Sequence, residues 1–318
     1  MLRWRFLLGA LFIAALAILC WLDCVVVTSR PGVFLLPLAL MVGWMGVVEL
    51  LEIFNHRGRM PLPWAMFSGV LISVLMAGLP VIWPELVAKT APGQLGWLTI
   101  GMTAGLLLAF WGEITRYDGK WHTTINLGLE AFSILYLGGT LGFIVQLRLL
   151  DLEPKDPFGL TGPSGQAGML ALVSLIAIVK MSDTGQYAIG RVLGRHKLAP
   201  LVSPGKTWEG VMGGALFAVV GAFLVFGWVE PYIMGTPNKS ADFFADTGRV
   251  VRVAIYALLV AAAGILGDLA ESLLKREAGI KDSSTWMPGF GGLLDLLDSL
   301  LVAAPVAYLL WALGLVSA

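Results

Sequence analysis

Long apolar runs recur along the whole of this 318-residue sequence, and they constrain its fold more than any other feature. A helix needs about 20 consecutive apolar residues to cross the hydrocarbon core of a bilayer. Runs close to that length cover residues 6–22, 33–54, 64–83, 95–112, 123–147, 167–189, 209–230, 250–267 and 291–316. The sequence therefore predicts an all-α, polytopic integral membrane protein with about nine transmembrane helices.

The composition agrees with a membrane protein. Only 13% of the residues are charged, whereas a soluble domain carries about 25%, and the mean hydropathy is +0.83. The formal net charge is zero, which gives no general reason to expect nucleic-acid binding. The first run follows Arg3 and Arg5, and no small-x-small cleavage site comes after it. We therefore expect a retained span and not a signal peptide.

The positions of the cations predict an orientation, because cytoplasmic loops hold the excess of Lys and Arg. If the N-terminus is cytoplasmic, thirteen of the 21 cations fall in cytoplasmic loops and seven in outer loops, with Lys180 inside a run. We therefore expect a cytoplasmic N-terminus and an external C-terminus. The loops near 190–208 and 268–290 then face the cytoplasm. We expect N-terminal transmembrane helices over residues 1–160 and a C-terminal catalytic region over 161–318.

Two pairs of carboxylates flank the second of these loops. Asp268 and Glu271 lie at the end of the eighth run, and Asp295 and Asp298 at the start of the ninth. Residues three apart share a helix face, and an antiparallel hairpin brings the two pairs to a similar depth. Convergent carboxylates predict a Mg²⁺ site. The alternative is a set of interfacial charges paired with Lys275, Arg276 and Lys281.

Between the two pairs, glycines interrupt the chain before the last helix begins, in the stretch Pro288-Gly289-Phe290-Gly291-Gly292. Free N–H groups at a helix start can bind phosphate oxygens, and glycine allows a close approach. We therefore expect Gly291 and Gly292 to contribute to substrate binding. A flexible turn of small residues that permits close helix packing is the alternative.

A second polar segment, SPGKTWEG, covers residues 203–210. Its Gly-Lys-Thr resembles part of a P-loop, but Pro200 stands where that motif needs glycine. What is left is a polar loop with Lys206 and the hydroxyls of Ser203 and Thr207, suited to a polyphosphate or an anionic lipid headgroup. A positive-inside loop without a ligand is the alternative. Asp183, near the end of the sixth run, is a candidate to join the carboxylates.

Three motifs in this order resemble those of the phosphatidate cytidylyltransferases, or CDP-diacylglycerol synthases. They are SDTG at 182–185, SPGKTWEG at 203–210 and the C-terminal signature S-x-L-K-R, four residues, K-D, then P-x-x-G-G-x-x-D-x-x-D that ends at Asp298. The resemblance covers roughly residues 165–300. This sequence departs from the family pattern at Phe290, where the family usually has histidine, and at Leu296, where it usually has arginine.

The resemblance implies an enzyme that joins phosphatidate to CTP and releases CDP-diacylglycerol and pyrophosphate at the cytoplasmic face of a membrane. It implies Mg²⁺, with room for a second cation, and a homodimer, and we expect a bacterial plasma (inner) membrane. On this basis Asp268 and Asp295 hold metal, and Asp298, Asp183 and Glu271 support them. The residues expected to bind phosphates and the rest of the substrates are Lys206, Lys275, Arg276, Lys281, Gly291, Gly292, Ser203 and Thr207.

Two alternatives stay open at this point. The first is a related CTP-dependent lipid enzyme, such as a polyprenol or phytol kinase or a CDP-archaeol synthase. The second is an ion-coupled transporter, which predicts broken helices in both halves of the chain and a site at the bilayer midplane. The polar motifs here gather in one half and at one face, which favours the enzyme.

Overall fold

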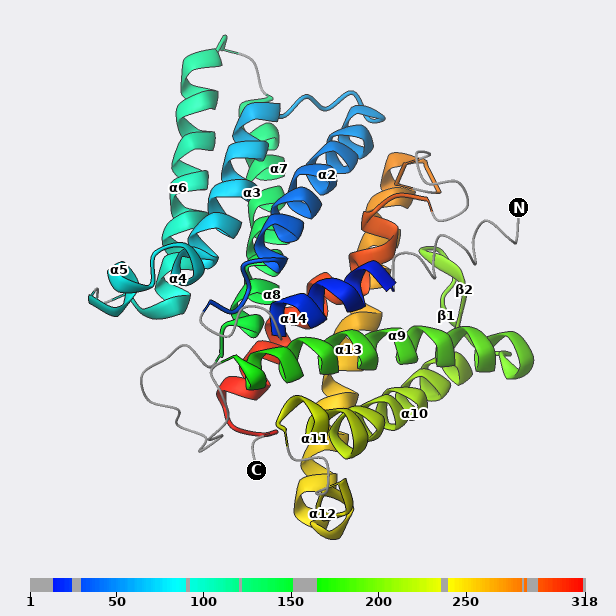
Figure 1. Ribbon diagram of the computed structural model, residues 1–318. Helices are drawn as coiled ribbons and strands as arrows, with labels where there is room; N and C mark the ends of the chain where they lie inside the picture. The colour runs from blue at the N-terminus through cyan, green and yellow to red at the C-terminus, as the bar shows by residue number, and fades with distance from the viewer. Residues whose placement is uncertain are drawn as a thin grey trace. The chain divides into compact units, whose positions relative to one another are not determined.

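The computed structural model describes residues 14–24, 30–89, 92–119, 122–150, 165–235, 240–281, 283–284 and 291–316. Most of these residues are helical (Figure 1). Contacts divide the chain into unit 1, Met1–Gln146 with Leu274–Leu297, and unit 2, Leu147–Leu273 with Asp298–Ala318. The expected boundary between residues 160 and 161 and the side chain of Phe290 lie outside the described residues.

Within the part of the chain that the structure describes, seven helical stretches are long and apolar enough to cross a membrane: Leu35–Asn55, Leu95–Arg116, Thr123–Arg148, Gln166–Leu193, Trp208–Ile233, Thr247–Ala278 and Leu294–Ala312. Two shorter apolar helices, Ala14–Cys24 and Pro63–Ala77, fall in the other two predicted runs. The all-α polytopic membrane fold is therefore confirmed. The number of nine spans stays a prediction.

Besides Leu274–Leu297, unit 1 contains helices of the first half of the chain: Ala14–Cys24, α2 (Leu35–Asn55), α3 (Pro63–Ala77), α4 (Leu79–Ile82), α5 (Pro84–Lys89), α6 (Gly93–Arg116), α7 (Thr123–Ser133), the π-helix η1 (Ile134–Gly139) and most of α8 (Thr140–Arg148). Helices α3 and α6 pack backbone to backbone at two glycines. A β-carbon on Gly105 would lie 2.7 Å from the Cα atom of Gly69. Small residues permit this close approach in a membrane protein, where van der Waals packing holds helices together.

Unit 2 contains α9 (Gln166–Leu193), strands β1 (Lys197–Ala199) and β2 (Ser203–Thr207), α10 (Trp208–Leu224), the π-helix η3 (Val225–Val229), α11 (Glu230–Ile233), α12 (Ser240–Ala245), most of α13 (Thr247–Ala278) and most of α14 (Leu294–Ala312). Helices α9 and α10 also meet at glycines, since a β-carbon on Gly185 would lie 2.6 Å from the Gly213 carbonyl oxygen. The buried Tyr256 hydroxyl lies 2.9 Å from Ser174 Oγ and accepts from the Trp311 indole N–H at 3.2 Å.

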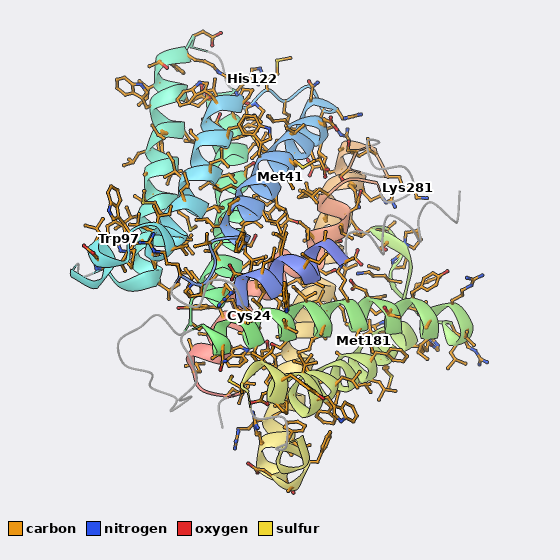
Figure 2. All side chains as sticks on the ribbon, in the orientation of Figure 1. Cys24, Met41, Trp97, His122, Met181 and Lys281 are labelled. Atoms are coloured by element: carbon orange, nitrogen blue, oxygen red, sulfur yellow. The ribbon has the colours of Figure 1, made fainter. Side chains whose placement is uncertain are left out.

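Apolar side chains also cover much of the outer surface of the helices. Met41 on α2, which Figure 2 labels, is 52% exposed, and Leu107 on α6 and Met212 on α10 are exposed as well. Large apolar side chains in contact with water would be unfavourable at this density. They suit a surface in contact with lipid, as the sequence predicts.

Two helices are longer than their apolar runs, and one connection holds strands. Helix α9 continues to Leu193 and α13 to Ala278. Asp268 therefore lies inside a helix, not at its end. The connection from 194 to 207 forms the antiparallel hairpin β1–β2, with Lys197 opposite Thr207 and Ala199 opposite Ser203. The sequence reading expected a loop there, because three- and five-residue strands carry no clear alternation.

The glycine contact between α3 and α6 gives a test of stability. We expect Gly105→Val to destabilise the protein by about 1–3 kcal/mol, because its side chain must displace the backbone of α3. The apparent midpoint of thermal unfolding in detergent should then fall by roughly 2–10 °C. Gly128→Val on α7 is the matched control, since nothing lies within 4 Å of a β-carbon there. Equal midpoints for the two variants would contradict the packing argument.

Candidate active site

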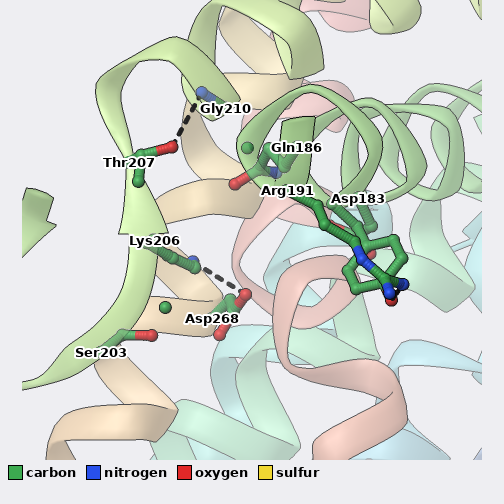
Figure 3. Close-up of a pocket in the computed structure, with 11 residues that line it drawn as sticks. Asp183, Gln186, Arg191, Ser203, Lys206, Thr207, Gly210 and Asp268 are labelled. Carbon is green, nitrogen blue, oxygen red and sulfur yellow. Dashed lines mark hydrogen bonds and ion pairs between the residues drawn. The ribbon is translucent and has the colours of Figure 1, made fainter. Parts of the chain in front are cut away.

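A polar pocket of about 400 Å³ lies in unit 2, between α9, strand β2, the start of α10 and α13 (Figure 3). We call it the hairpin pocket. Its side chains include Asp183 and Arg191 from α9, Ser203 and Lys206 from β2, and Asp268 from α13. Residues from SDTG, SPGKTWEG and the eighth predicted span therefore line one pocket.

An ion pair crosses this pocket. Lys206 Nζ lies 2.8 Å from Asp268 Oδ2, and the Lys206 side chain is only 13% exposed. The same ammonium group is 3.5 Å from the carbonyl oxygen of Ile265. Because the ammonium group is largely shielded from bulk water, its attraction for an anion is screened less than that of a surface lysine. The pocket thus offers an ammonium group that can bind a phosphate oxygen and a carboxylate that can bind a metal ion.

Two more carboxylates lie within electrostatic range of Asp268. The negative charge of Asp268 acts on both Asp183 and Asp298. Asp183 also forms an ion pair with Lys180 at 3.4 Å, one turn earlier on α9. Asp298 is 6% exposed and accepts from the Ser299 N–H, and Glu271 on α13 is 1% exposed. Unit 2 therefore gathers carboxylates from α9, α13 and α14, with lysines among them.

The hairpin that carries Lys206 is fixed to α10 by two side chains. The Thr207 hydroxyl accepts from the Gly210 N–H at 3.2 Å and so caps α10. The Glu209 carboxylate accepts from the N–H groups of Arg195 at 3.0 Å and His196 at 3.2 Å, and lies 2.6 Å from His196 Nδ1. Main-chain hydrogen bonds to a carboxylate are strong, so these contacts hold the strand and Lys206 in place.

At one side of the pocket, the Arg191 guanidinium group donates to the Tyr187 hydroxyl at 2.8 Å and lies 5.8 Å from the centre of its ring. Both residues are one turn apart on α9, and Tyr187 is exposed. The stacked ring orients the guanidinium group without neutralising its charge.

A second polar cluster belongs to unit 1 and surrounds Asp295. Asp295 Oδ2 accepts from the Ser283 N–H at 3.0 Å and from the Gly292 N–H at 2.8 Å, and Oδ1 accepts from Lys275. The Ser283 hydroxyl lies 2.9 Å from Oδ2 as well. Gly291 has φ +83°, and a β-carbon on Gly292 would lie 2.0 Å from Ser283 Oγ. The glycines are thus required by the turn itself. We call this cluster the Asp295 turn.

Glu49 from α2 completes the Asp295 turn. It is 1% exposed, and its carboxylate accepts from the N–H groups of Leu293 at 2.5 Å and Leu294 at 2.8 Å. Its Oε2 atom also lies 2.9 Å from Ser283 Oγ. The Gly292 N–H, one of the groups predicted to bind phosphate, donates to Asp295, and the next two N–H groups, of Leu293 and Leu294, donate to Glu49. Phosphate binding by this turn stays a prediction.

The structure places most of the predicted site residues in two groups, and two of them, Arg276 and Lys281, lie outside these groups. The hairpin pocket brings together Asp183, Ser203, Lys206, Thr207 and Asp268, with Glu271 and Asp298 buried in the same unit. The Asp295 turn brings together Lys275, Gly291, Gly292 and Asp295. Lys281 is exposed, and Arg276 lies 3.4 Å from the Ile280 carbonyl oxygen.

The pocket's donor chemistry fits a magnesium ion. Among the described residues, no three His, Cys, Asp or Glu side chains are grouped closely enough to form a metal cage. Mg²⁺ usually takes only one or two carboxylates, with substrate phosphates and water completing its shell. Asp183 and Asp268, which face one pocket, supply that number of hard oxygen ligands.

Comparison with known proteins identifies the family. A family model described as cytidylyltransferase family matches residues 10–313. The chain belongs to the cytidylyltransferase family. A phosphatidate cytidylyltransferase of Brucella suis biovar 1 is 34% identical over 269 residues, which cover 79% of this chain and 87% of the relative.

Two further relatives carry the same name. The phosphatidate cytidylyltransferase of Bacillus subtilis is 28% identical over 87% of this chain and 90% of its own length. That of Haemophilus influenzae is 43% identical over 128 residues, 40% of this chain and 41% of the relative. The family makes this chain a membrane-embedded nucleotidyltransferase and does not favour the kinase, archaeol or transporter alternatives.

Two functional-site residues of this cytidylyltransferase, Glu49 and Glu209, are not evident from the sequence motifs. A glutamate within an apolar run is the only local signal for Glu49, and its partners lie 234 to 245 residues away in the sequence. Glu209 lies two residues after the helix cap Thr207, and it accepts hydrogen bonds from the main-chain N–H groups of Arg195 and His196 at the other end of the hairpin.

Glu49 gives a sharp test of the Asp295 turn. We expect Glu49→Gln to lower kcat/KM for CTP by about tenfold to a hundredfold. The amide removes a buried charge that accepts three hydrogen bonds, each worth about 1.5–3 kcal/mol, and so loosens the turn that positions Asp295 and Lys275. The measurement is steady-state kinetics at matched protein amounts, after thermal unfolding has shown that the variant is folded.

Glu52→Gln is the matched control, because Glu52 lies one turn along the same helix and is exposed. The control should keep activity within about twofold of the parent. Equal kinetics for the two glutamine variants would show that the Asp295 turn does not depend on Glu49.

Proposed function

We propose that the chain transfers the cytidylyl group of CTP to phosphatidate, which gives CDP-diacylglycerol and pyrophosphate. An oxygen of the lipid phosphate attacks the α-phosphorus of CTP, and the bond from that phosphorus to the oxygen bridging to the β-phosphate breaks. Pyrophosphate leaves with the bonding electrons. Catalysis of this kind depends on positioning and on neutralising charge, and it needs no covalent nucleophile.

The observation that carries the proposal is the Lys206–Asp268 pair in the hairpin pocket. A shielded ammonium group beside the hydroxyl of Ser203 and the guanidinium group of Arg191 suits a chain of phosphates. On binding, Lys206 exchanges the carboxylate of Asp268 for a phosphate oxygen and stabilises the charge that develops on the leaving pyrophosphate. Arg191, already oriented by Tyr187, takes a second phosphate.

Asp183 and Asp268 are the proposed ligands of Mg²⁺ in this pocket, with Glu271 and Asp298 supporting them. Bound Mg²⁺ neutralises phosphate charge and acts as a Lewis acid. Asp268, whose side chain is 34% exposed, would then have the metal as its counter-charge in place of Lys206. A second cation, and a metal role for Asp295, rest on the family resemblance.

The Asp295 turn is proposed to position basic groups for the substrates. Lys275 is held by Asp295, and Arg276 follows it on the same helix. Lys281 is exposed beside the turn. Together these three cations suit the phosphate of phosphatidate or of CTP, as the resemblance implies. The backbone of Gly291 and Gly292 supports them through the tight turn that it permits.

The proposed setting is a bacterial inner membrane, with the N-terminus and the hairpin pocket on the cytoplasmic side, where CTP is available. The excess of cations in the alternate loops supports this orientation. The proposed assembly is a homodimer, which the family resemblance implies and which the mass of the detergent-solubilised protein would test.

Product analysis tests the reaction. The purified protein with CTP, Mg²⁺ and phosphatidate should form CDP-diacylglycerol and pyrophosphate in equal amounts. We expect Lys206→Gln to lower kcat/KM for CTP by about 10²–10³-fold, the loss typical when one preorganised donor to a developing charge is removed.

Lys197→Gln is the control for Lys206, since it removes the same charge from the other strand of the hairpin, where the side chain is exposed. It should retain activity within about threefold. If both variants turn over like the parent, the hairpin pocket is not where CTP phosphates bind.

Cysteine labelling tests the orientation. In a chain with Cys20→Ala and Cys24→Ala, a cysteine at Lys197 should react with a membrane-impermeant maleimide only from the cytoplasmic side. One at Arg30 should react only from outside. Both positions are exposed. Labelling of position 197 from outside would separate the hairpin pocket from the cytoplasmic CTP pool and defeat the proposed mechanism.

A further inference from the structure

Unit 1 contains a second polar pocket that the proposed reaction does not use. Its volume is about 580 Å³, and it lies among the α2–α3 connection, the end of α6 and the start of α7. Arg57, Arg59, Arg116, His122 and Asn126 line it. We call it the arginine pocket. It shares no lining residue with the hairpin pocket.

Two of the arginines come from the α2–α3 connection and one comes from the end of α6, and they keep hydrogen-bond donors for a ligand. The Arg116 guanidinium group donates to the Met60 carbonyl oxygen at 2.8 Å and lies 3.0 Å from Glu113, which is 3% exposed. These contacts fix its orientation. Arg59 lies 3.5 Å from Glu277, with 41% of its side chain exposed. An exposed ion pair contributes little energy, so a phosphate can readily replace Glu277.

The lining of the pocket holds fewer carboxylates than arginines. Glu113 is neutralised by Arg116, and Asp118 is the other carboxylate of the lining. Arg57, whose Nε–H donates to the main-chain carbonyl of Glu277, meets no carboxylate in that contact. His122 adds a ring nitrogen. A dianionic group therefore finds more positive than negative charge in the lining.

The first turn of α7 adds neutral donors. Asn126 lines the pocket and is 6% exposed. Its carboxamide can both donate a hydrogen bond to a polar ligand and accept one from it. No side chain among the described residues caps the start of α7, so its first N–H groups also favour an anion.

We propose that the arginine pocket binds a phosphate group, carried by an anionic lipid headgroup or by a free phosphate ester. Arginines with planar, forked donors are the usual partners of phosphate. The lining also includes the exposed apolar side chains of Met60 and Ile125. Apolar groups beside the arginines favour the lipid, whose glycerol and acyl chains can contact them. The site is additional to the hairpin pocket and does not depend on the proposed reaction.

The test compares three probes on the detergent-solubilised full chain by native mass spectrometry. They are dioctanoyl phosphatidylglycerol, which joins phosphate to acyl chains, sn-glycerol 3-phosphate, which has phosphate alone, and dioctanoylglycerol, which has acyl chains alone. We expect the phosphatidylglycerol to bind more tightly than dioctanoylglycerol. Glycerol 3-phosphate binding as tightly as the phospholipid would support the phosphate site and make its natural ligand soluble.

Substitutions then test whether phosphatidylglycerol binds in the arginine pocket. Arg59→Gln should weaken phosphatidylglycerol binding by about tenfold, the loss expected for a hydrogen bond to a charged group. Arg30→Gln, which removes an exposed arginine of unit 1 outside the pocket lining, should leave binding unchanged. Lys206→Gln should also leave it unchanged, which separates the arginine pocket from the hairpin pocket.

Arg116→Gln alone would leave Glu113 buried without its counter-charge, so the second variant combines it with Glu113→Gln. This pair should also weaken binding by about tenfold while the thermal unfolding midpoint stays near that of the parent. Equal affinities for phosphatidylglycerol and dioctanoylglycerol, or affinities unchanged in both Arg59→Gln and the double variant, would overturn the proposal.

Discussion

Buried carboxylates stabilise the starts of several helices in unit 1 by accepting hydrogen bonds from main-chain N–H groups. In hydrocarbon no water satisfies the N–H groups that the first turn of a helix leaves without partners. Asp23 accepts from Gly32 and Phe34 before α2, Glu130 accepts from Leu62 before α3, and Glu49 accepts from Leu293 and Leu294 at the start of α14. Each of these hydrogen bonds satisfies a main-chain donor and a buried carboxylate oxygen, both of which would be costly to leave without a partner.

Close backbone packing is the second requirement, and it explains many of the glycines. Without a hydrophobic driving force between helices in lipid, association depends on contact. Gly69 with Gly105, and Gly185 with Gly213, let helix backbones meet. At the Asp295 turn the same property of glycine serves a different purpose. A side chain at 292 would occupy the space of Ser283 and Glu49, and the turn could not hold Asp295 through the hydrogen bonds of this structure.

Much of the fold follows from the sequence, and part of the site does. The apolar runs predict the spans because bilayer thickness fixes helix length, and the grouping of Ser203, Lys206 and Thr207 follows from a short segment. The approach of Asp268 to Lys206 across about 60 residues, and of Glu49 to Leu293 across 244 residues, depends on which helices are neighbours. No local pattern encodes that. The short strands β1 and β2 were missed because their hydrogen bonds, and not side-chain alternation, define them.

The division of labour within SPGKTWEG shows how a short motif can be both structural and chemical. Thr207 caps α10, Glu209 secures the turn of Arg195 and His196, and Gly210 fits close to Gly190 on α9. Thr207, Glu209 and Gly210 therefore serve the hydrogen bonding and packing of the protein itself. Lys206 forms an ion pair with Asp268 that a ligand can replace. A β-carbon on Gly205 would meet no described atom within 4 Å, so there is open space beside Lys206. A segment that is anchored at both ends and open between them can present one cation to a phosphate without moving, and preorganisation of this kind lowers the cost of stabilising charge during the transfer.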